Sequence, residues 1–201
     1  PVDVLTRCIA ESPLCYQPGS KWLYGLNTDL LGYIVQLVSG SKLDQFFETE
    51  IFAPLGMKKT GFAVSPQDLH KLSECYEVAP GHCIKLSVSP ERDRSELKAL
   101  LAGGGGLVST VDDYQTFATM LAREGQYVDK NGIVRNLVKA ASIRAMRQNH
   151  LPDGVDLASF GFDKSFSETV GAGYGFGYGV STVIKPSEVP GGSLSPIGAM
   201  A

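Results

Sequence analysis

A run of alternating glycines near the C-terminal end of the chain places the strongest constraint on its fold. In "GAGYGFGYGVSTVI", residues 171–184, aromatic and β-branched residues alternate with glycines. A two-residue period built from Tyr, Phe, Val and Thr is typical of a β-strand, so we predict a strand over roughly 172–185. The opposite face of this strand consists largely of glycine, which allows a helix or a ligand to approach closely.

Helical patterns dominate the chain before this strand, over roughly 27–150. Apolar residues recur at helical spacing between Asn27 and Gly40 and predict a helix over this range. A capping box from Ser41 to Asp44 indicates a second helix that ends at Gly56, and the two helices are expected to pack as a hairpin. Residues 63–94 lack a sustained period and are interpreted as irregular strands and loops.

Two further helices complete the pattern. A capping box from Thr110 to Asp113 indicates a third helix that ends at Gly125, and a fourth is predicted over about 138–149. The sequence contains neither an internal repeat nor an evident linker. Helices in the middle and a sheet strand late in the chain therefore predict an α+β fold and a single domain over residues 1–201.

Charge and cysteine content argue against several classes of function. A formal net charge of −3 gives no electrostatic footprint for nucleic acid, and no apolar run approaches the ~20 residues of a membrane span. The four cysteines form no C-x-x-C pair, and His70, His82 and Cys83 are interpreted as loop residues and a small thiol, so no metal site is predicted. Unpaired cysteines slightly favour a reducing, cytoplasmic compartment.

Several familiar nucleotide-binding and catalytic motifs are absent or incomplete in the sequence. The tetraglycine at residues 103–106 is followed by Leu107 where a phosphate-binding loop requires Lys and Ser or Thr, so we interpret it as close backbone packing before a helix. No G-x-S-x-G occurs. Two S-x-x-K strings, at residues 39–42 and 95–98, are interpreted as chance matches: the first spans a helix end, and the second lies in a charged, exposed-looking stretch.

Three segments in order, "PGSKWLYGLNTDLLGYIVQLVSG", "IFAPLGMKKTGF" and "AGGGGLVSTVDDYQTFATML", resemble the serine β-lactamase-like superfamily. This group contains class C β-lactamases, D-alanyl-D-alanine carboxypeptidases and family VIII carboxylesterases. The resemblance implies an antiparallel sheet flanked by helices, with a helical subdomain, that is incomplete in this chain. It also implies a serine hydrolase that forms an acyl-serine intermediate without a metal or an organic cofactor.

The resemblance gives Tyr24 a catalytic role. In the family, the tyrosine after P-G-x-x-W lies near the lysine of the S-x-x-K motif and moves protons to and from the serine and the leaving group. A neighbouring ammonium group favours the phenolate form of such a tyrosine. The Pro18–Gly19 turn and Trp22 would hold the phenol at the edge of a cleft. The alternative is a tyrosine that packs its ring beside Trp22 and donates one hydrogen bond.

Two residues after this tyrosine bear on the substrate. The lactamases usually have Y-x-N, but here Leu26 occupies the position of the amide and Asn27 comes one place later. One residue turns a helix by about 100°, so Asn27 does not directly replace the amide. We expect Leu26 and Asn27 to contact a small ester. The alternatives are a lactam or peptide substrate, or a catalytically silent homologue that binds or self-assembles. The oligomeric state is left open.

Two motifs of the family are missing from the sequence. Only 23 residues precede Tyr24, too few for the S-x-x-K helix, and "EVPGGSLSPIGAMA" matches no third motif of the K-T-G, H-x-G or W-G-G type. Neither partner of an oxyanion hole is therefore identifiable. We expect the nucleophilic serine to lie outside these 201 residues, the 201-residue piece alone to be inactive, and the apolar helix faces to be incompletely covered.

Overall fold

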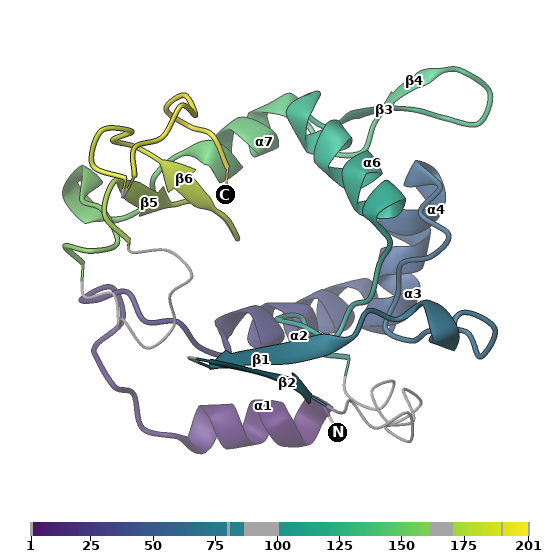
Figure 1. Cartoon of the computed structure of the whole chain (residues 1–201), viewed down its shortest axis with the longest axis horizontal. Helices are drawn as coiled ribbons and strands as arrows, with labels where there is room; N and C mark the ends of the chain where they lie inside the picture. Colours follow the sequence, from purple (N-terminus) through teal and green to yellow (C-terminus); the bar gives the residue numbers. More distant parts are fainter. Residues whose placement is uncertain (1, 80, 87–100, 161–170, 190, 201) are drawn as a thin grey trace. The chain divides into compact units, whose positions relative to one another are not determined.

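The computed structural model describes residues 2–79, 81–86, 101–160, 171–189 and 191–200. The chain forms two compact units, and each is described by itself. Unit 1 comprises residues 1–7 and 29–116, and unit 2 comprises residues 8–28 and 117–201. Figure 1 traces the elements in sequence order. No helix in these ranges is long and apolar enough to cross a membrane.

The helices begin with α1 (Val2–Glu11) and α2 (Asn27–Ser39), so the helix predicted from Asn27 is present. The second predicted helix is a continuous helical run made of α3 (Leu43–Phe47), a π-helical turn (Glu48–Phe52) and α4 (Ala53–Leu55). This run ends as predicted at Gly56, whose φ of 72° is left-handed and therefore suited to glycine.

The capping box predicted from Ser41 to Asp44 is wrong. Lys42 occupies the N-cap position of α3 and makes no side-chain cap. The Asp44 carboxylate accepts a hydrogen bond from the N–H of the adjacent Gln45 at 2.9 Å, while the Ser41 N–H donates to the Ser39 hydroxyl at 3.2 Å. Helix α3 starts one residue later than a Ser41 cap requires, because this start buries the Leu43 side chain fully in the core, at 0% exposure.

The core of unit 1 joins the first two predicted helices. Leu43, Phe62 and Leu101 are buried together, and Val35 of α2 and Phe47 of α3 pack against them. The rings of Phe47 and Phe62 are stacked with centroids 6.0 Å apart. Burial of this apolar surface, at about 25 cal/mol per Å², holds the helix pair together, which agrees with the predicted hairpin.

The tetraglycine packs against α2, as the sequence suggested. A Cβ on Gly32 would lie 2.8 Å from the Cα of Gly103, and the N–H of Gly104 donates to the Asp29 carboxylate at 3.1 Å. Only glycine permits this approach of two backbones. The next helix, α6 (Val111–Ala122), follows at once, and the Thr110 hydroxyl accepts a hydrogen bond from the Asp113 N–H at 3.3 Å, which is half of the predicted capping box.

The irregular region of unit 1 contains one hairpin among its described residues. A 3-10 turn (Leu69–Lys71) precedes β1 (Cys75–Ala79), which pairs antiparallel with β2 (His82–Leu86), the two lying side by side in Figure 1. Residues 87–94 of the predicted irregular region and the S-x-x-K string at 95–98 lie outside the described residues. The other S-x-x-K string joins the end of α2 to the N-cap of α3, so its two side chains do not share a helix face.

The described residues of unit 2 include α7 (Ala140–Arg147), a 3-10 turn (Pro152–Gly154) and two hairpins. The first hairpin, β3 (Gln126–Val128) with β4 (Val134–Asn136), was not predicted. The second replaces the single strand predicted over 172–185: it consists of β5 (Tyr174–Phe176) and β6 (Ser181–Val183), paired antiparallel. The chain reverses between Gly177, whose N–H donates to the Val180 carbonyl at 2.8 Å, and Val180 itself.

The glycine face of β5 is covered by the end of α7 and the residues after it. A Cβ on Gly175 would overlap the side chain of Asn149, and one on Gly177 would overlap the carbonyl oxygen of Met146. Both glycines are buried. The prediction that this face admits a close neighbour is therefore confirmed, and the neighbour is the chain itself.

Candidate functional site

The predicted catalytic segment, residues 17–27, connects to β5 within unit 2. The Trp22 N–H donates to the Phe160 carbonyl oxygen at 3.0 Å. The Trp22 ring meets the ring of Phe176 on β5 edge to face, with centroids 5.3 Å apart. Such an aromatic pair contributes about 0.5–1.5 kcal/mol beyond its buried area. Trp22 is thus the anchor of the segment, as the sequence suggested.

Tyr24 lies two residues beyond this anchor and is 51% exposed. Its ring is tilted against that of Trp22, with a centroid separation of 6.2 Å and an interplanar angle of 51°. The packing expected of a structural tyrosine is therefore present, and half of the side chain also remains accessible. The exposure does not decide between the two roles, so the catalytic role of Tyr24 stands as a prediction.

The two predicted substrate-contacting residues follow directly. Leu26 is 53% exposed, and Asn27 is the first residue of α2 and is also exposed. The structure thus places Tyr24, Leu26 and Asn27 on one short accessible segment of unit 2. Contact with a substrate remains a prediction for both.

Asn149, which the sequence analysis did not single out, holds β5 in place. Its side-chain oxygen accepts hydrogen bonds from the N–H groups of Phe176 and Leu151, both at 3.1 Å. Its side-chain NH₂ donates to the Val155 carbonyl at 2.8 Å. Because the Phe176 ring packs against Trp22, Asn149 indirectly supports the segment that contains Tyr24. A lone Asn in a loop gives no sequence signal for this role.

Asp156 is a second residue that the sequence analysis missed, and its side chain is buried at 5% exposure. The carboxylate accepts hydrogen bonds from the Ser159 hydroxyl at 2.6 Å, the Ser159 N–H at 2.9 Å and the Gly173 N–H at 3.2 Å. Burial raises the pKa of this carboxyl, but these hydrogen bonds and the charge of Lys185 outweigh it and leave the pKa lowered. Asp156 therefore stays ionised and ties residues 156–159 to the start of β5. The D-x-x-S spacing, typical of a side-chain-capped turn, was the available signal.

Candidate metal ligands are not brought together in the ranges that the structure describes. No three His, Cys, Asp or Glu side chains there are arranged to hold an ion. His70 and His82 are both exposed. Cys8 and Cys15 are exposed free thiols.

Comparison with known proteins identifies the class to which this fold and segment belong. The β-lactamase family model matches residues 2–194, so the chain belongs to the β-lactamase family. This confirms the resemblance inferred from the three sequence segments, including the one that contains Tyr24. It also confirms the partial α+β, β-lactamase/transpeptidase-like fold.

The individual relatives were found by sequence and by structure. Protein Rv1367c of Mycobacterium tuberculosis is 30% identical over 92% of this chain and 44% of its own length. Esterase EstB of Burkholderia gladioli is 28% identical over 88% of this chain and 43% of its own length. Among solved structures, EstCE1, described as a hydrolase with promiscuous acyltransferase activity, superposes with a TM-score of 0.71 at 24% identity, over 98% of this chain and 49% of that one. The chain thus spans less than half the length of these relatives.

Proposed function

We propose that this protein is a serine hydrolase that cleaves small carboxylic esters through an acyl-serine intermediate. The observation that carries the proposal is the half-exposed Tyr24, held beside the anchored Trp22 in the tyrosine motif of the β-lactamase family. A general acid or base must be both accessible and fixed in place. Exposure of 51% meets the first condition, and the Trp22 contacts to Phe160 and Phe176 meet the second.

The proposed reaction has two steps. A serine hydroxyl attacks the ester carbonyl and loses its proton, the alkoxide leaving group accepts a proton, and the acyl group is now bonded to the serine. Water then attacks the acyl-serine, releasing the acid and restoring the hydroxyl. Tyr24 is proposed to relay the proton in each step. The serine and its lysine are proposed to lie outside these 201 residues, since the S-x-x-K string at 39–42 lacks helical geometry.

Leu26 supports ester over lactam hydrolysis. It presents an apolar, 53% exposed side chain two residues after the tyrosine, where the lactamases have an amide. An apolar side chain there offers no hydrogen bond to the acyl amide of a lactam or a peptide, and leaving that polar group unpaired weakens its binding. EstB and EstCE1, an esterase and a hydrolase by name, are similar to this chain at the level of sequence and fold, respectively.

The test is hydrolysis of p-nitrophenyl butyrate by the purified protein with its S-x-x-K serine present. Tyr24→Phe should lower kcat by at least about tenfold, a threshold set below the roughly 10²–10⁴-fold that general acid–base catalysis typically contributes. Tyr16→Phe is the matched control: Tyr16 directly precedes this segment, is 43% exposed and packs its ring under the Lys21 ammonium at 4.7 Å, a contact that Phe retains. Unchanged turnover in Tyr24→Phe would remove the tyrosine from the mechanism. A kcat/KM for nitrocefin above that for the ester would favour the lactamase alternative.

A second candidate, a catalytically silent binding or self-assembling homologue, has one observation in its favour. The apolar residues Leu31, Leu37 and Val38 of α2 are 58%, 64% and 84% exposed. An exposed apolar row of this kind often marks a surface that another chain or segment covers. This candidate predicts no ester hydrolysis above background even when the S-x-x-K serine is present, so the same assay decides between the two.

A further inference from the structure

A cavity of about 270 Å³ in unit 1 is lined by three lysines. Lys58, Lys59 and Lys71 come from two stretches of chain, before and after the loop that contains Ser65 and Asp68. The remaining lining is made of hydroxyl and short apolar side chains: Thr60, Ser65, Ser109, Thr110, Ala63, Val64, Leu72 and Val108, together with Asp68. Unit 1 does not contain Tyr24, so a ligand of this cavity does not depend on the proposed hydrolase function.

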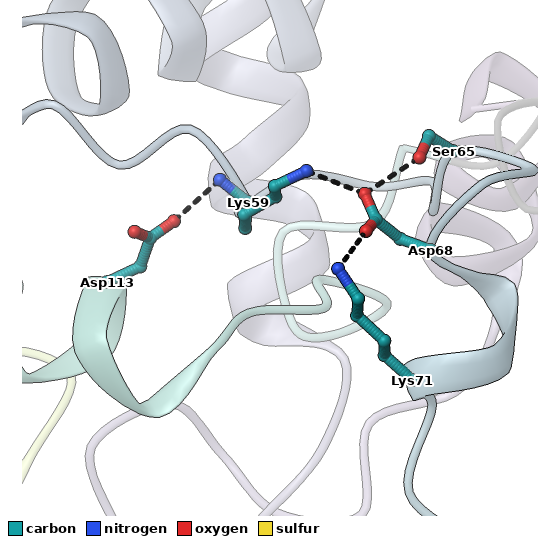
Figure 2. A network of polar contacts seen from close by, with 5 residues as sticks. All are labelled: Lys59, Ser65, Asp68, Lys71 and Asp113. Carbon is teal, nitrogen blue, oxygen red and sulfur yellow. Dashed lines mark hydrogen bonds and ion pairs between the residues drawn. The ribbon is translucent and has the colours of Figure 1, made fainter.

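The Asp68 carboxylate fixes two of these lysines. Its two oxygens each accept a hydrogen bond from one ammonium group, Oδ2 from Lys59 and Oδ1 from Lys71, both at 2.7 Å. The Ser65 hydroxyl donates to Oδ2 at 2.8 Å. Figure 2 shows the two ammonium groups reaching the carboxylate from different sides. These contacts hold the pKa of Asp68 well below its usual range, and the hydrogen bond from Lys59 lowers it most. The carboxylate is therefore ionised at neutral pH.

The arrangement leaves an excess of positive charge and of hydrogen-bond donors. The lining residues include three lysines and one aspartate, a formal balance of two positive charges, which falls to one when the adjacent Asp113 carboxylate is counted. The Asp113 carboxylate lies next to the lining, where its Oδ2 already accepts hydrogen bonds from the Lys59 N–H at 2.7 Å and the Thr60 hydroxyl at 2.9 Å. An ammonium group has three donors, and Asp68 engages one on each of Lys59 and Lys71. The other donors are able to serve a second anion.

Two hydroxyl groups of the lining are already engaged within the protein, because the single O–H of Thr60 donates to Asp113. The Thr60 and Ser109 hydroxyls lie 2.8 Å apart and form one hydrogen bond between them. They adjoin Thr110, directly before α6, whose first turn already contains Asp112 and Asp113. The donors left for a ligand are therefore those of the lysines, and a tetrahedral oxyanion has several acceptor oxygens for charge-assisted hydrogen bonds from them.

We propose that this cavity binds the phosphate group of a small phosphomonoester, with a short apolar arm against Ala63, Val64 and Leu72. The volume of about 270 Å³ is just below the range for drug-sized ligands, about 300–1,000 Å³, and suits a ligand of a few carbon atoms. A monocarboxylate places only one charge and two oxygens against the same donors and therefore binds more weakly. Inorganic phosphate satisfies the donors but leaves the apolar wall uncovered.

The test is a calorimetric titration of the purified protein with propyl phosphate, inorganic phosphate and butyrate at constant ionic strength, which holds screening fixed. Propyl phosphate should bind with a Kd on the order of 1 mM or below. It should bind severalfold more tightly than inorganic phosphate, since each buried CH₂ group contributes up to about fourfold. Butyrate should bind about tenfold more weakly than propyl phosphate. Inorganic phosphate binding as tightly as propyl phosphate would reject the apolar arm and with it the phosphomonoester.

Lysine variants locate the site. Lys71→Gln should weaken propyl phosphate binding about tenfold, because a charge-assisted hydrogen bond is lost. Lys58→Gln should weaken it by a smaller factor, and since Lys58 takes no part in the Asp68 ion pairs, this variant leaves that network intact. Lys42→Gln removes the same charge from an exposed position at the start of α3, outside the cavity, and should change the Kd by less than about twofold.

Three further results would overturn the proposal. One is the absence of saturable propyl phosphate binding up to about 20 mM, far above the expected Kd. Another is butyrate binding as tightly as propyl phosphate. The third is equal weakening by Lys42→Gln and Lys58→Gln, which would mean that the affinity for the anion depends on the net charge of the protein and not on this cavity. Circular dichroism of each variant confirms that the affinities compare folded proteins.

Discussion

Replacement of Gly177 by alanine tests the packing that positions β5. An alanine Cβ at this position would overlap the carbonyl oxygen of Met146 and come within 3.2 Å of the carbonyl oxygen of Gln148. Both neighbours are backbone atoms at the end of α7, so neither moves out of the way by a change of rotamer. The φ angle of Gly177 lies outside the left-handed region, so the cost arises from overlap and not from backbone strain.

The size of the effect follows from three contributions. Forcing an extra methyl group into a packed site costs about 1–3 kcal/mol. The Tyr178 N–H donates to the same Met146 oxygen at 3.3 Å, and losing this hydrogen bond costs about 0.5–1.5 kcal/mol. Alanine restricts the unfolded chain and returns about 0.4–1 kcal/mol. The net free energy of unfolding should fall by about 2 kcal/mol, which for a protein of this size lowers the Tm by about 4–8 °C.

Thermal unfolding followed by circular dichroism measures this change, with Gly105→Ala as the matched control. Gly105 is exposed, has no atom within 4 Å of the point that an added methyl group would occupy and adopts no left-handed φ, so its replacement should leave the Tm nearly unchanged or slightly raised. A Tm for Gly177→Ala within about 1 °C of this control would refute the reasoning. It would mean that α7 does not cover the glycine face of β5.

Two further predictions concern the Asp68 network and the substrate. Because Lys59, Lys71 and Ser65 lower the pKa of Asp68 below its ordinary value of 3.8, the stabilisation is present above about pH 4 and is lost as the pH falls further. The Tm difference between the wild-type protein and Asp68→Asn should therefore be larger at pH 7 than at pH 3, and a difference that grew towards pH 3 would contradict the assignment. Leu26→Asn restores the Y-x-N order of the lactamases and should raise the ratio of nitrocefin to p-nitrophenyl butyrate kcat/KM by about tenfold, the worth of one hydrogen bond to the acyl amide. An unchanged ratio would show that this position does not contact the acyl group.

Local sequence signals predicted the helices well and the strands poorly. The helix from Asn27 and the stop at Gly56 depend on apolar spacing and on the left-handed preference of glycine, both of which are properties of neighbouring residues. The capping box at Ser41 failed because the burial of Leu43 decides where α3 begins, and burial depends on residues far along the chain, namely Phe62 and Leu101.

The strand predicted over 172–185 shows a different limit. Alternation of glycine with aromatic residues is compatible with one long strand or with a hairpin, because both keep a two-residue period on each side of a turn. The reversal occurs between Gly177 and Val180, where Gly179 has a φ of 79° that favours glycine. Every second residue here is glycine, so the pattern supplied several equivalent turn positions and did not distinguish among them.

The supporting residues of the candidate site were hidden from sequence for a related reason. Asn149 and Asp156 each act through backbone N–H groups of β5 or the residue before it, and neither contact follows from a motif. Their effect is nevertheless specific: they hold the strand whose Phe176 receives the Trp22 ring. The tyrosine motif thus predicts which phenol to examine, while the distant Asn and Asp determine whether that phenol has a fixed support.

Tyr24 is half exposed, and its described ring contact is with the neighbouring Trp22. A side chain with 51% of its surface in solvent gains little positional restraint from its own burial. The restraint comes instead from Trp22, whose backbone N–H and ring are both engaged within unit 2, by Phe160 and Phe176. Accessibility on a rigid support is the arrangement that proton transfer requires.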